Sequence, residues 1–465
     1  MPRKRSGSIT TIRVEEFLSH GKPEVGYGNG NAVHATEVTQ SQSEIYQLFK
    51  PFLALMSVLG LYHERRSGAK VHDAFLSDKK NSTAKLNWWK VYGVVAVVVL
   101  WLNAVRGFTA FDGSESLSSP FVFFKVLYVA YYIYCALLST LCFHMCNQED
   151  GLGTFWQEVA QLEHEIPTIV KANGLRRVIS VSAAFAIIFV LFNFVYMLST
   201  TVIGAQFPFF FTPFDRFVNM TVMTTESGLV LGFTCLVGLI MSGAAYASVA
   251  LFVCVCYVHY CSFREFNAEF KEAVKHSIKS ERLIDLETYR RKHQKICRLM
   301  EISDDLFSAF VAFTLVFSTG LLCLLIYILI YHFSAVTSSV INIIAFTIWI
   351  SQFILQLTLI SMGAFVNHQA HSPLSELHDI QLDPFKIDQL IPFQMFLNKL
   401  SVNPIGFSAL GLFTIDKPTI LTIIGMVLTY FFLMIQFQPS IGSSSDSTGL
   451  PSATNTSSAA NATVT

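Results

Sequence analysis

The sequence predicts an all-α polytopic membrane protein with seven transmembrane helices, a cytosolic amino terminus and an extracellular carboxyl terminus. Of the 465 residues, 52% are hydrophobic and only 14% are charged, whereas about a quarter of the residues in soluble globular domains are charged. Seven apolar stretches are each long enough to cross the bilayer. The basic residues gather in alternate connections between these stretches. The composition therefore indicates that lipid is the solvent.

The seven apolar stretches follow a polar amino-terminal region. A helix rises about 1.5 Å per residue, so roughly 20 apolar residues cross about 30 Å of hydrocarbon. The stretches cover residues 88–105, 121–144, 178–203, 228–260, 306–332, 338–366 and 418–437. Because the fourth is too long for the bilayer alone, we expect its helix to continue into the cytosol.

A shorter apolar stretch, residues 46–62, precedes the first span and is interrupted by Lys50 and Pro51. We interpret it as an amphipathic or re-entrant helix at the inner membrane surface rather than an eighth span. The basic residues 3–5 are followed by polar residues and not by the apolar core of a signal peptide. The first span is therefore expected to direct insertion itself.

The distribution of Lys and Arg predicts the orientation, because cytoplasmic loops keep an excess of both. The region before the first span holds twelve, and the loop after the fourth span holds ten between Arg264 and Arg298. The loops after the second and sixth spans hold three each. The connections on the other side offer only Arg106 and Arg216. The amino terminus is therefore expected inside.

Glycosylation sequons support this orientation, because the transferase meets only asparagines outside the cytosol. Asn219, Asn455 and Asn461 fall on the predicted outer side and are expected to carry glycans, whereas Asn81 falls inside. The nine cysteines lie in spans or on the cytosolic side, so we expect no extracellular disulfide. Their spacing is not that of a zinc site, and the chain has no P-loop, nucleophile elbow or HExxH motif. We expect no metal, no cofactor and no enzymatic activity.

Four segments organise the chain. Residues 1–43 are predicted to be a disordered cytosolic tail, 44–87 the amphipathic or re-entrant segment with a linker, 88–438 the seven-helix transmembrane domain, and 439–465 a disordered extracellular tail. Cytosolic helical extensions are expected at 261–305 and 367–417. In the first, Phe266, Phe270, Val274 and Ile278 are spaced four apart. Such an apolar stripe needs a packing partner, so the two extensions predict a packed cytosolic region that could join subunits.

The last span carries the most specific motif. Thr429-Tyr430 is followed by the five apolar residues 431–435 and then by Gln436-Phe437. At the end of a seventh span, this motif resembles the signature of insect gustatory receptors, which belong to the invertebrate gustatory and odorant receptor superfamily. Residues 407–416 resemble that family's approach to its seventh helix, and residues 50–61 its opening segment. The resemblance extends over 46–437, although only the carboxyl-terminal part is specific.

The resemblance implies a chemoreceptor that is itself a ligand-gated, non-selective cation channel in the plasma membrane of sensory neurons. It implies a homo- or heterotetramer whose seventh helix lines the pore, with a small-molecule ligand, cations and membrane lipid as partners. The net charge is zero, so nothing predicts a nucleic-acid partner.

The seventh helix has one face unlike lipid. Thr429, Leu433 and Gln436 lie at i, i+4 and i+7. An unpaired amide in hydrocarbon costs several kcal/mol, so Gln436 needs water or a polar partner. We hypothesise that Gln436 and Phe437 form a constriction or gate near the outer end of the pore. The alternative is that Gln436 bonds a neighbouring helix within the bundle.

Side chains in the outer half of the bundle offer a pocket for a ligand. Aromatic walls with a few polar groups suit a small neutral molecule, and a lysine inside a span can face a cavity or extend to the membrane surface. The same aromatic and amide residues also suit an interfacial belt and interhelical hydrogen bonds. Lys125 is expected to pair with Glu226 if it faces the cavity. The candidates are Lys125, Tyr128, Tyr131, Tyr132, Glu226, Trp349 and Gln352.

Three other functions are alternatives to a chemoreceptor channel. A light or hydrogen-peroxide sensor on the same scaffold, like certain nematode relatives, would use the five tryptophans to absorb light and the cysteines for oxidation. A G-protein-coupled receptor also has seven spans, but it needs the amino terminus outside. A transporter would show inverted repeats or glycine-broken helix pairs, which we do not find in the sequence.

Overall fold

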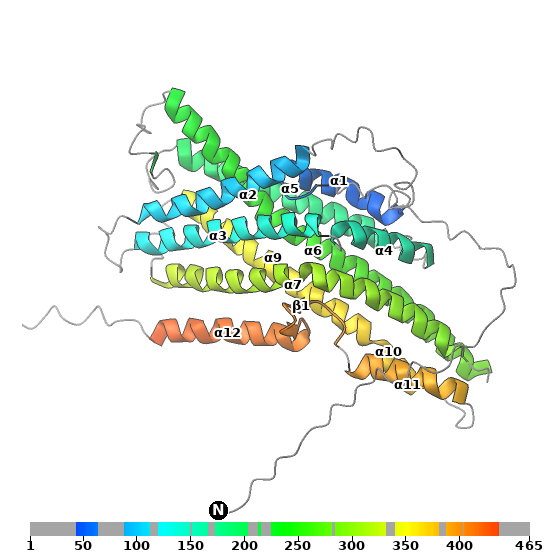
Figure 1. Cartoon of the computed structure of the whole chain (residues 1–465). Coiled ribbons are helices and arrows are strands. Elements are labelled where there is room, and N and C mark those ends of the chain that lie inside the picture. The colour runs from blue at the N-terminus through cyan, green and yellow to red at the C-terminus, as the bar shows by residue number, and fades with distance from the viewer. Residues whose placement is uncertain are drawn as a thin grey trace, which may run out of the picture. The chain divides into compact units, whose positions relative to one another are not determined.

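The computed structural model describes residues 43–63, 88–111, 120–148, 151–165, 173–202, 213–214, 225–280, 284–331, 340–380, 387–402 and 404–436. These residues lie within one compact unit, Thr39–Thr465, and are almost entirely helical (Figure 1). The predicted tails at 1–43 and 439–465 lie outside the described residues, apart from Ser43.

Seven long helices make up most of the described chain. They are α2 (Trp88–Gly107), α3 (Pro120–Asn147), α5 (Asn173–Val202), α6 (Thr225–Ser280), α7 (Leu286–Tyr331), α9 (Val340–His371) and α12 (Lys417–Gln436). The shorter elements are α1 (Glu44–Val58), the 3-10 helix η3 (Phe108–Ala110), α4 (Leu152–Glu165), α10 (Pro373–His378), α11 (Ile387–Val402) and the strands β1 (Ser408–Ala409) and β2 (Phe413–Thr414).

Within the described residues, five helices are long and apolar enough to cross a membrane, namely α2, α3, α5, α6 and α7. The apolar part of α12, Lys417–Leu433, is shorter. Each of the seven predicted stretches falls on a different long helix, so the predicted positions agree with the helices. The number of spans and their orientation stay predictions.

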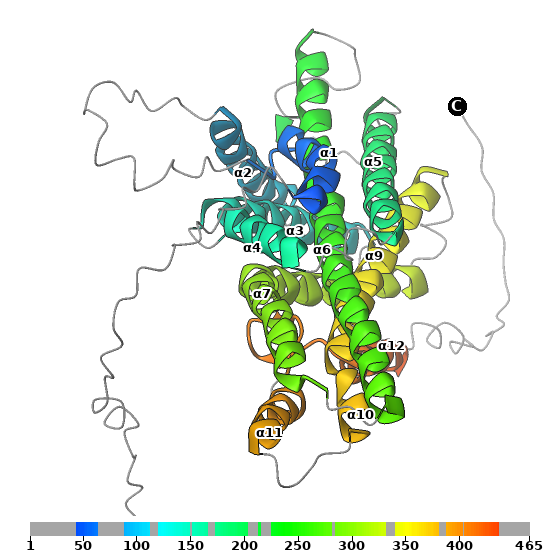
Figure 2. The ribbon, with the colours of Figure 1, turned by 90° about the vertical axis from the view of Figure 1, so that its right-hand side faces the viewer.

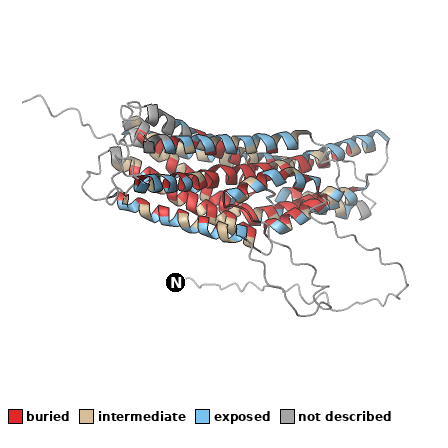
Figure 3. Cartoon of the chain, turned by 90° about the horizontal axis from the view of Figure 1, so that it is seen from above, coloured by how far each residue is buried: buried red, intermediate tan, exposed pale blue. Residues whose placement is uncertain are grey.

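α6 is the central helix of the bundle. It continues without a break for 56 residues, about 84 Å at 1.5 Å per residue, which confirms that the fourth stretch extends as helix beyond the bilayer thickness. Residues 240–256 of its apolar half are all buried, and α6 packs against α2, α3, α5, α7 and α9. Figure 2 shows α6 between these neighbours, and Figure 3 shows the buried residues gathered on the inner faces of the helices.

α1 is an amphipathic helix that packs on α4. The Phe49 ring lies 4.8 Å from the Trp156 ring, centroid to centroid, and Tyr46 contacts the same indole. Glu163 of α4 accepts the Ser43 hydroxyl over 2.6 Å and the backbone N–H of Glu44 over 2.8 Å, so it satisfies donors at the start of α1. α1 buries the apolar side chains on one of its faces, and its place at the inner membrane surface stays a prediction.

The charged extensions of α6 and α7 form an antiparallel pair that packs against α11. Phe266 and Phe270 stack with their ring centroids 5.9 Å apart, and Phe396 of α11 lies 5.9 Å from Phe270. Of the apolar stripe, Phe266, Phe270 and Val274 are buried, whereas Ile278, two positions from the end of α6, is 52% exposed. The cytosolic location of this region and its role in joining subunits stay predictions.

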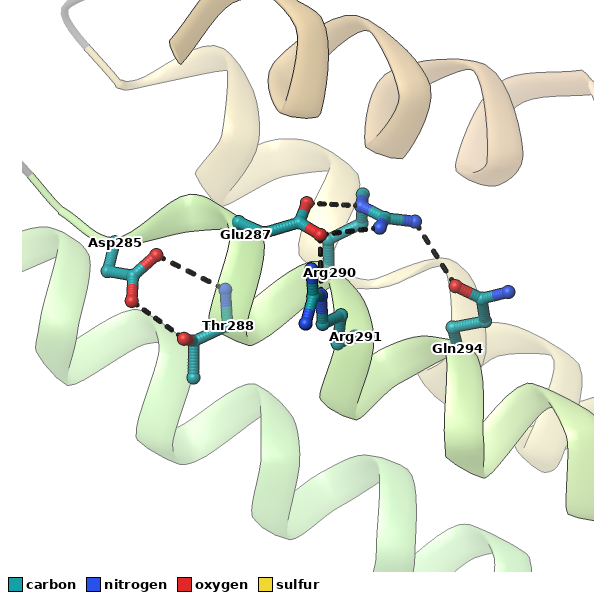
Figure 4. A network of polar contacts seen from close by, with 6 residues as sticks. All are labelled: Asp285, Glu287, Thr288, Arg290, Arg291 and Gln294. Carbon is teal, nitrogen blue, oxygen red and sulfur yellow. Dashed lines mark hydrogen bonds and ion pairs between the residues drawn. The ribbon is translucent and has the colours of Figure 1, made fainter. Parts of the chain in front are cut away.

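The first turn of α7 carries a network of polar contacts (Figure 4). Asp285 accepts the backbone N–H and the hydroxyl of Thr288, the latter over 2.6 Å, as a helix-capping residue does. Glu287 accepts from Arg290 and Arg291 over 2.7 and 2.6 Å. The hydrogen bonds from these two guanidinium groups lower the pKa of Glu287 to about 2. Charged groups in this number belong in water rather than in lipid.

Candidate functional site

A layer of hydrogen-bonded polar side chains crosses the apolar bundle between α3, α5, α6 and α9. In this polar layer, the hydroxyl oxygens of Tyr128 on α3 and Tyr196 on α5 lie 3.0 Å apart. Both side chains are buried. A buried hydroxyl without a partner costs free energy in an apolar environment. The pairing therefore allows two tyrosines to turn their polar ends into the bundle.

Asn193 of α5 extends the polar layer to the middle of α6. Its Nδ2 donates to the Ser242 hydroxyl oxygen over 2.6 Å. On α2, the Nδ2 of Asn103 lies 3.4 Å from the Met241 sulfur. The Oδ1 of Asn103 accepts from Arg106 Nε over 3.0 Å. Asn103 of α2 and Asn193 of α5 thus contact adjacent residues of α6.

Tyr246 joins α6 to α9. Its hydroxyl oxygen lies 3.4 Å from the Ser351 hydroxyl oxygen, and its ring stacks on Phe189 of α5 with centroids 5.4 Å apart. Tyr246 and Ser351 are both buried. The polar layer is therefore walled by aromatic rings and reaches the helix on which Trp349 and Gln352 were predicted as pocket residues.

The polar layer combines hydroxyl and amide groups with apolar walls. Hydroxyl and amide groups inside apolar walls fix the orientation of a neutral ligand by hydrogen bonds. The described residues contain no group of three or more His, Cys, Asp or Glu side chains that could hold a metal ion. Because the hydroxyls above are paired with one another, a ligand would exchange its own hydrogen bonds for theirs.

The three tyrosines predicted on the second span are all buried but have different neighbours. Tyr128 belongs to the polar layer. The Tyr131 ring lies 6.4 Å from Tyr134 on the same helix. Tyr132 packs on α2 at Gly107, where a Cβ would come within 3.1 Å of its ring. A pocket role for Tyr131 and Tyr132 stays a prediction.

Lys125 is buried, with 7% of its surface exposed, and its Nζ donates to the Ala110 carbonyl oxygen over 2.8 Å. Ala110 ends η3, and carbonyl oxygens at a helix end carry partial negative charge. This contact helps to account for an ammonium group inside the bundle. Glu226 has an exposed side chain in the first turn of α6, and its pairing with Lys125 stays a prediction.

Several predicted site residues lie outside the described part of the chain. Trp349 and Gln352 belong to α9, but their side chains are not among those described. Gln356, one turn beyond Gln352, is buried. Phe437 and the sequon residues Asn219, Asn455 and Asn461 lie wholly outside the described residues.

α12 differs from the other long helices because most of its side chains are exposed. Its main packing partners are α7 and α9. Thr429, Leu433 and Gln436 are all exposed. The Thr429 hydroxyl donates to the Gly425 carbonyl oxygen over 2.8 Å, so it is satisfied within its own helix and is compatible with a pore face or a lipid face.

Sequence reasoning missed most of the polar layer. One signal was available, because an amide inside an apolar stretch is costly unless it is paired, and both Asn103 and Asn193 are such residues. Serine gives no comparable signal, since its hydroxyl can bond a carbonyl of its own helix. The missed residues are Asn103, Asn193, Tyr196, Ser242, Tyr246 and Ser351.

Comparisons with known proteins return matches at the level of family and fold. Residues 49–441 match the family described as 7tm Chemosensory receptor. No curated protein sequence matches. The solved structure of the insect olfactory receptor OR5 from Machilis hrabei is similar, with a TM-score of 0.63 at 15% identity, covering 84% of this chain and 98% of that chain. The same receptor in complex with eugenol has a TM-score of 0.62 at 16% identity, with the same coverage. At such low identity, these similarities show the fold.

Proposed function

This chain belongs to the 7tm Chemosensory receptor family, and from that premise we propose that it is a gustatory-type sensory receptor acting as a ligand-gated, non-selective cation channel. The family match over residues 49–441 is the observation that carries the proposal. The channel would lie in the plasma membrane of sensory neurons as a multi-pass protein.

The proposal includes seven spans, with the amino terminus in the cytosol and the carboxyl terminus outside. The seven predicted stretches fall on α2, α3, α5, α6, α7, α9 and α12. The charged extensions of α6 and α7 project beyond the predicted spans, and that of α7 carries the ion pairs of Figure 4. By the excess of basic residues, this end of the bundle is the cytosolic one. The domain limits 1–43, 44–87, 88–438 and 439–465 follow from this topology.

We assign the pore to α12. The exposed side chains of an apolar membrane helix can face lipid, other subunits or a water-filled pore. Thr429, Leu433 and Gln436 would face the pore, with Gln436 and Phe437 near its outer end. The positions of the first three on one exposed face support this assignment.

Four subunits, identical or mixed, would surround the pore. Besides α12, α11 has exposed apolar residues on one face, among them Ile391, Met395 and Val402. Their spacing of four and seven residues places them on one stripe of the helix. Contact between such stripes in the cytosolic region would hold the subunits together while the pore helices move.

The ligand would be a small neutral molecule with at least one hydrogen-bonding group. The polar layer around Tyr128, Tyr196 and Tyr246 supports this class of ligand. The structurally similar receptor OR5 has been solved in complex with eugenol, a small organic molecule.

Recording from cells that express the chain tests the proposal. The panel is sugars, bitter compounds, hydrogen peroxide and blue light, and the readout is whole-cell current with surface staining as the control for expression. We expect a cation current in response to at least one organic compound. Responses to light or peroxide alone would favour the sensor alternative. A chain that reaches the surface and passes no current, alone or with other family members, would contradict channel function.

A further inference from the structure

A short β-hairpin connects α11 to α12 and lies against α7. Its strands pair Ser408 with Thr414 and Ala409 with Phe413. Leu410 in its turn has a φ of 51°, a left-handed backbone conformation that is unfavourable for a residue with a Cβ. Such strain persists only where surrounding contacts impose it. Only two residues separate the hairpin from α12, so the position of the hairpin decides where α12 begins.

Asp304 of α7 holds the first strand of the hairpin with both carboxylate oxygens. Oδ1 accepts the backbone N–H of Ser408 over 2.6 Å, and Oδ2 accepts the Ser408 hydroxyl over 2.8 Å. Hydrogen bonds to an ionised carboxylate are stronger than neutral ones. One turn further along α7, the Ser308 carbonyl oxygen accepts the N–H of Leu410 over 3.3 Å. We call the Asp304–Ser408 contact the hairpin clamp.

The far end of the hairpin forms one unit with the first turn of α12. Asp416 accepts the backbone N–H of Thr419 over 2.8 Å, and the Thr419 hydroxyl lies 3.2 Å from the Thr414 carbonyl oxygen. Thr414 pairs with Ser408 across the hairpin. A continuous set of hydrogen bonds and strand pairing therefore leads from Asp304 on α7 to the start of α12.

Apolar contacts keep the hairpin folded independently of the hairpin clamp. Phe407 is fully buried, and its ring lies 4.7 Å from Phe252 and 5.8 Å from the His259 imidazole. Ile415 is also buried, and its N–H donates to the Phe407 carbonyl oxygen over 2.8 Å. A substitution in the hairpin clamp should therefore loosen the hairpin on α7 without unfolding it.

We propose that Asp304 is a positioning residue for the pore helix, which couples movement of α7 to α12 through Ser408 and the hairpin. This inference rests on the proposed channel function. α7 packs against α3 and α6, which carry much of the polar layer. A ligand that shifts these helices moves Asp304 with them, and the hairpin transmits that shift to α12. Coupling is measured as the ratio of the gating equilibrium constants with and without ligand.

Single-channel recording of three variants tests the inference. Asp304→Ala removes both acceptors, and Ser408→Ala removes only the hydroxyl. Asp305→Ala is the matched control, since Asp305 is the exposed neighbour of Asp304 and has the same charge. We expect the ratio to fall about tenfold in Asp304→Ala, the size expected for losing a hydrogen bond to a charged group. Ser408→Ala should lower the ratio in the same direction, and Asp305→Ala should leave it unchanged.

Two further readouts separate coupling from general damage. The unitary conductance should stay at the wild-type value in all three variants, because the pore-facing residues are untouched. The double variant Asp304→Ala/Ser408→Ala should be no worse than Asp304→Ala alone, since both changes break one contact. If Asp304→Ala does not reach the cell surface, the ratio measured in Ser408→Ala decides the test by itself.

The outcomes distinguish this inference from the proposed function. If the wild type passes current and the ratio is unchanged in Ser408→Ala and Asp304→Ala, the role of the hairpin clamp is overturned and the channel proposal stays intact. The same holds if the ratio falls equally in Asp305→Ala. A wild-type chain at the surface that passes no current, alone or with other family members, would overturn both.

Discussion

In the Tyr128–Tyr196 pair of the polar layer, a Tyr→Phe substitution removes a hydroxyl group and leaves the aromatic ring in place. Tyr128→Phe removes one hydroxyl and takes away a partner of the Tyr196 hydroxyl, which costs about 1 to 3 kcal/mol in a buried site. We expect a lower thermal unfolding midpoint and, for a ligand that bonds this pair, a half-maximal concentration about tenfold higher.

Tyr92→Phe is the control for this pair. The Tyr92 hydroxyl donates to the Val58 carbonyl oxygen over 2.9 Å in an exposed position, so the same chemical change is made away from the polar layer. Dose–response curves are measured for Tyr128→Phe, Tyr196→Phe and Tyr92→Phe. An equal shift of the half-maximal concentration in all three variants would argue against ligand binding at the polar layer.

His293 makes the packed extensions sensitive to acid. Its ring is buried, Nε2 donates to the Ala370 carbonyl oxygen over 3.2 Å, and Nδ1 lies 3.4 Å from the Cys297 sulfur. Burial lowers the pKa of His293 to about 4, from an ordinary 6.5. Between about pH 6.5 and pH 4, the His293 imidazole binds a proton in the unfolded chain but not in the folded chain. The stabilisation is therefore complete above pH 6.5 and is lost between about 6.5 and 4.

His293→Gln should flatten this part of the stability profile. His293 contributes at most about 1.4 kcal/mol per pH unit to the slope of the free energy of unfolding against pH. The measurement is the change in the unfolding midpoint of purified protein between pH 7 and pH 5. His378→Gln changes an exposed histidine of α10 and should leave the wild-type slope. A slope that is the same in His293→Gln and wild type would rule out this source of acid sensitivity.

At the scale of the elements, the turn after α1 depends on a glycine. Gly60 has a φ of 76°, and a Cβ there would lie 2.8 Å from the Ala96 Cβ of α2. Gly60→Ala should destabilise the protein by roughly 1 to 2 kcal/mol from the left-handed backbone alone, with the close contact adding to this cost. Gly320→Ala in α7 meets nothing within 4 Å and should not lower the unfolding midpoint. Equal midpoints for the two variants would contradict the structure of this turn.

For α12, cysteine substitution tests the pore face. In Leu433→Cys and Gln436→Cys, a water-soluble thiol reagent applied from outside should block or reduce the ligand-evoked current. Leu428 is also exposed but lies about 100° around the helix from the centre of the face formed by Thr429, Leu433 and Gln436. Leu428→Cys should therefore be insensitive to the reagent. The native cysteines are buried except Cys323, which is partly buried, so a reagent-resistant wild type is expected. Modification at Leu428 but not at Gln436 would place the pore on another face.

At the scale of the whole molecule, the orientation in the membrane controls every functional assignment. We expect an epitope placed after Thr465 to bind antibody on intact cells, because an odd number of spans carries the carboxyl terminus outside when the amino terminus is inside. An epitope before Met1 should bind only after permeabilisation and serves as the control. The opposite pattern would put the charged extensions of α6 and α7 outside and exclude the proposed pore direction.

Hydropathy and motif alone determined the helix positions and the family of this protein. The apolar stretches coincide with the long helices, because crossing hydrocarbon demands a run of apolar residues that is readable locally. The motif from Thr429 to Phe437 predicted the family that the match over residues 49–441 confirms.

Only the tertiary structure decided which side chains meet inside the bundle. The hydroxyl pair of Tyr128 and Tyr196 joins residues 68 positions apart, and the hairpin clamp joins residues 104 positions apart. A local pattern carries no record of such partners, since helix packing, not periodicity, brings them within hydrogen-bonding distance. For the same reason, no pattern in the sequence connects Asp304 with Ser408, and only the packing of the hairpin on α7 makes them a link to α12.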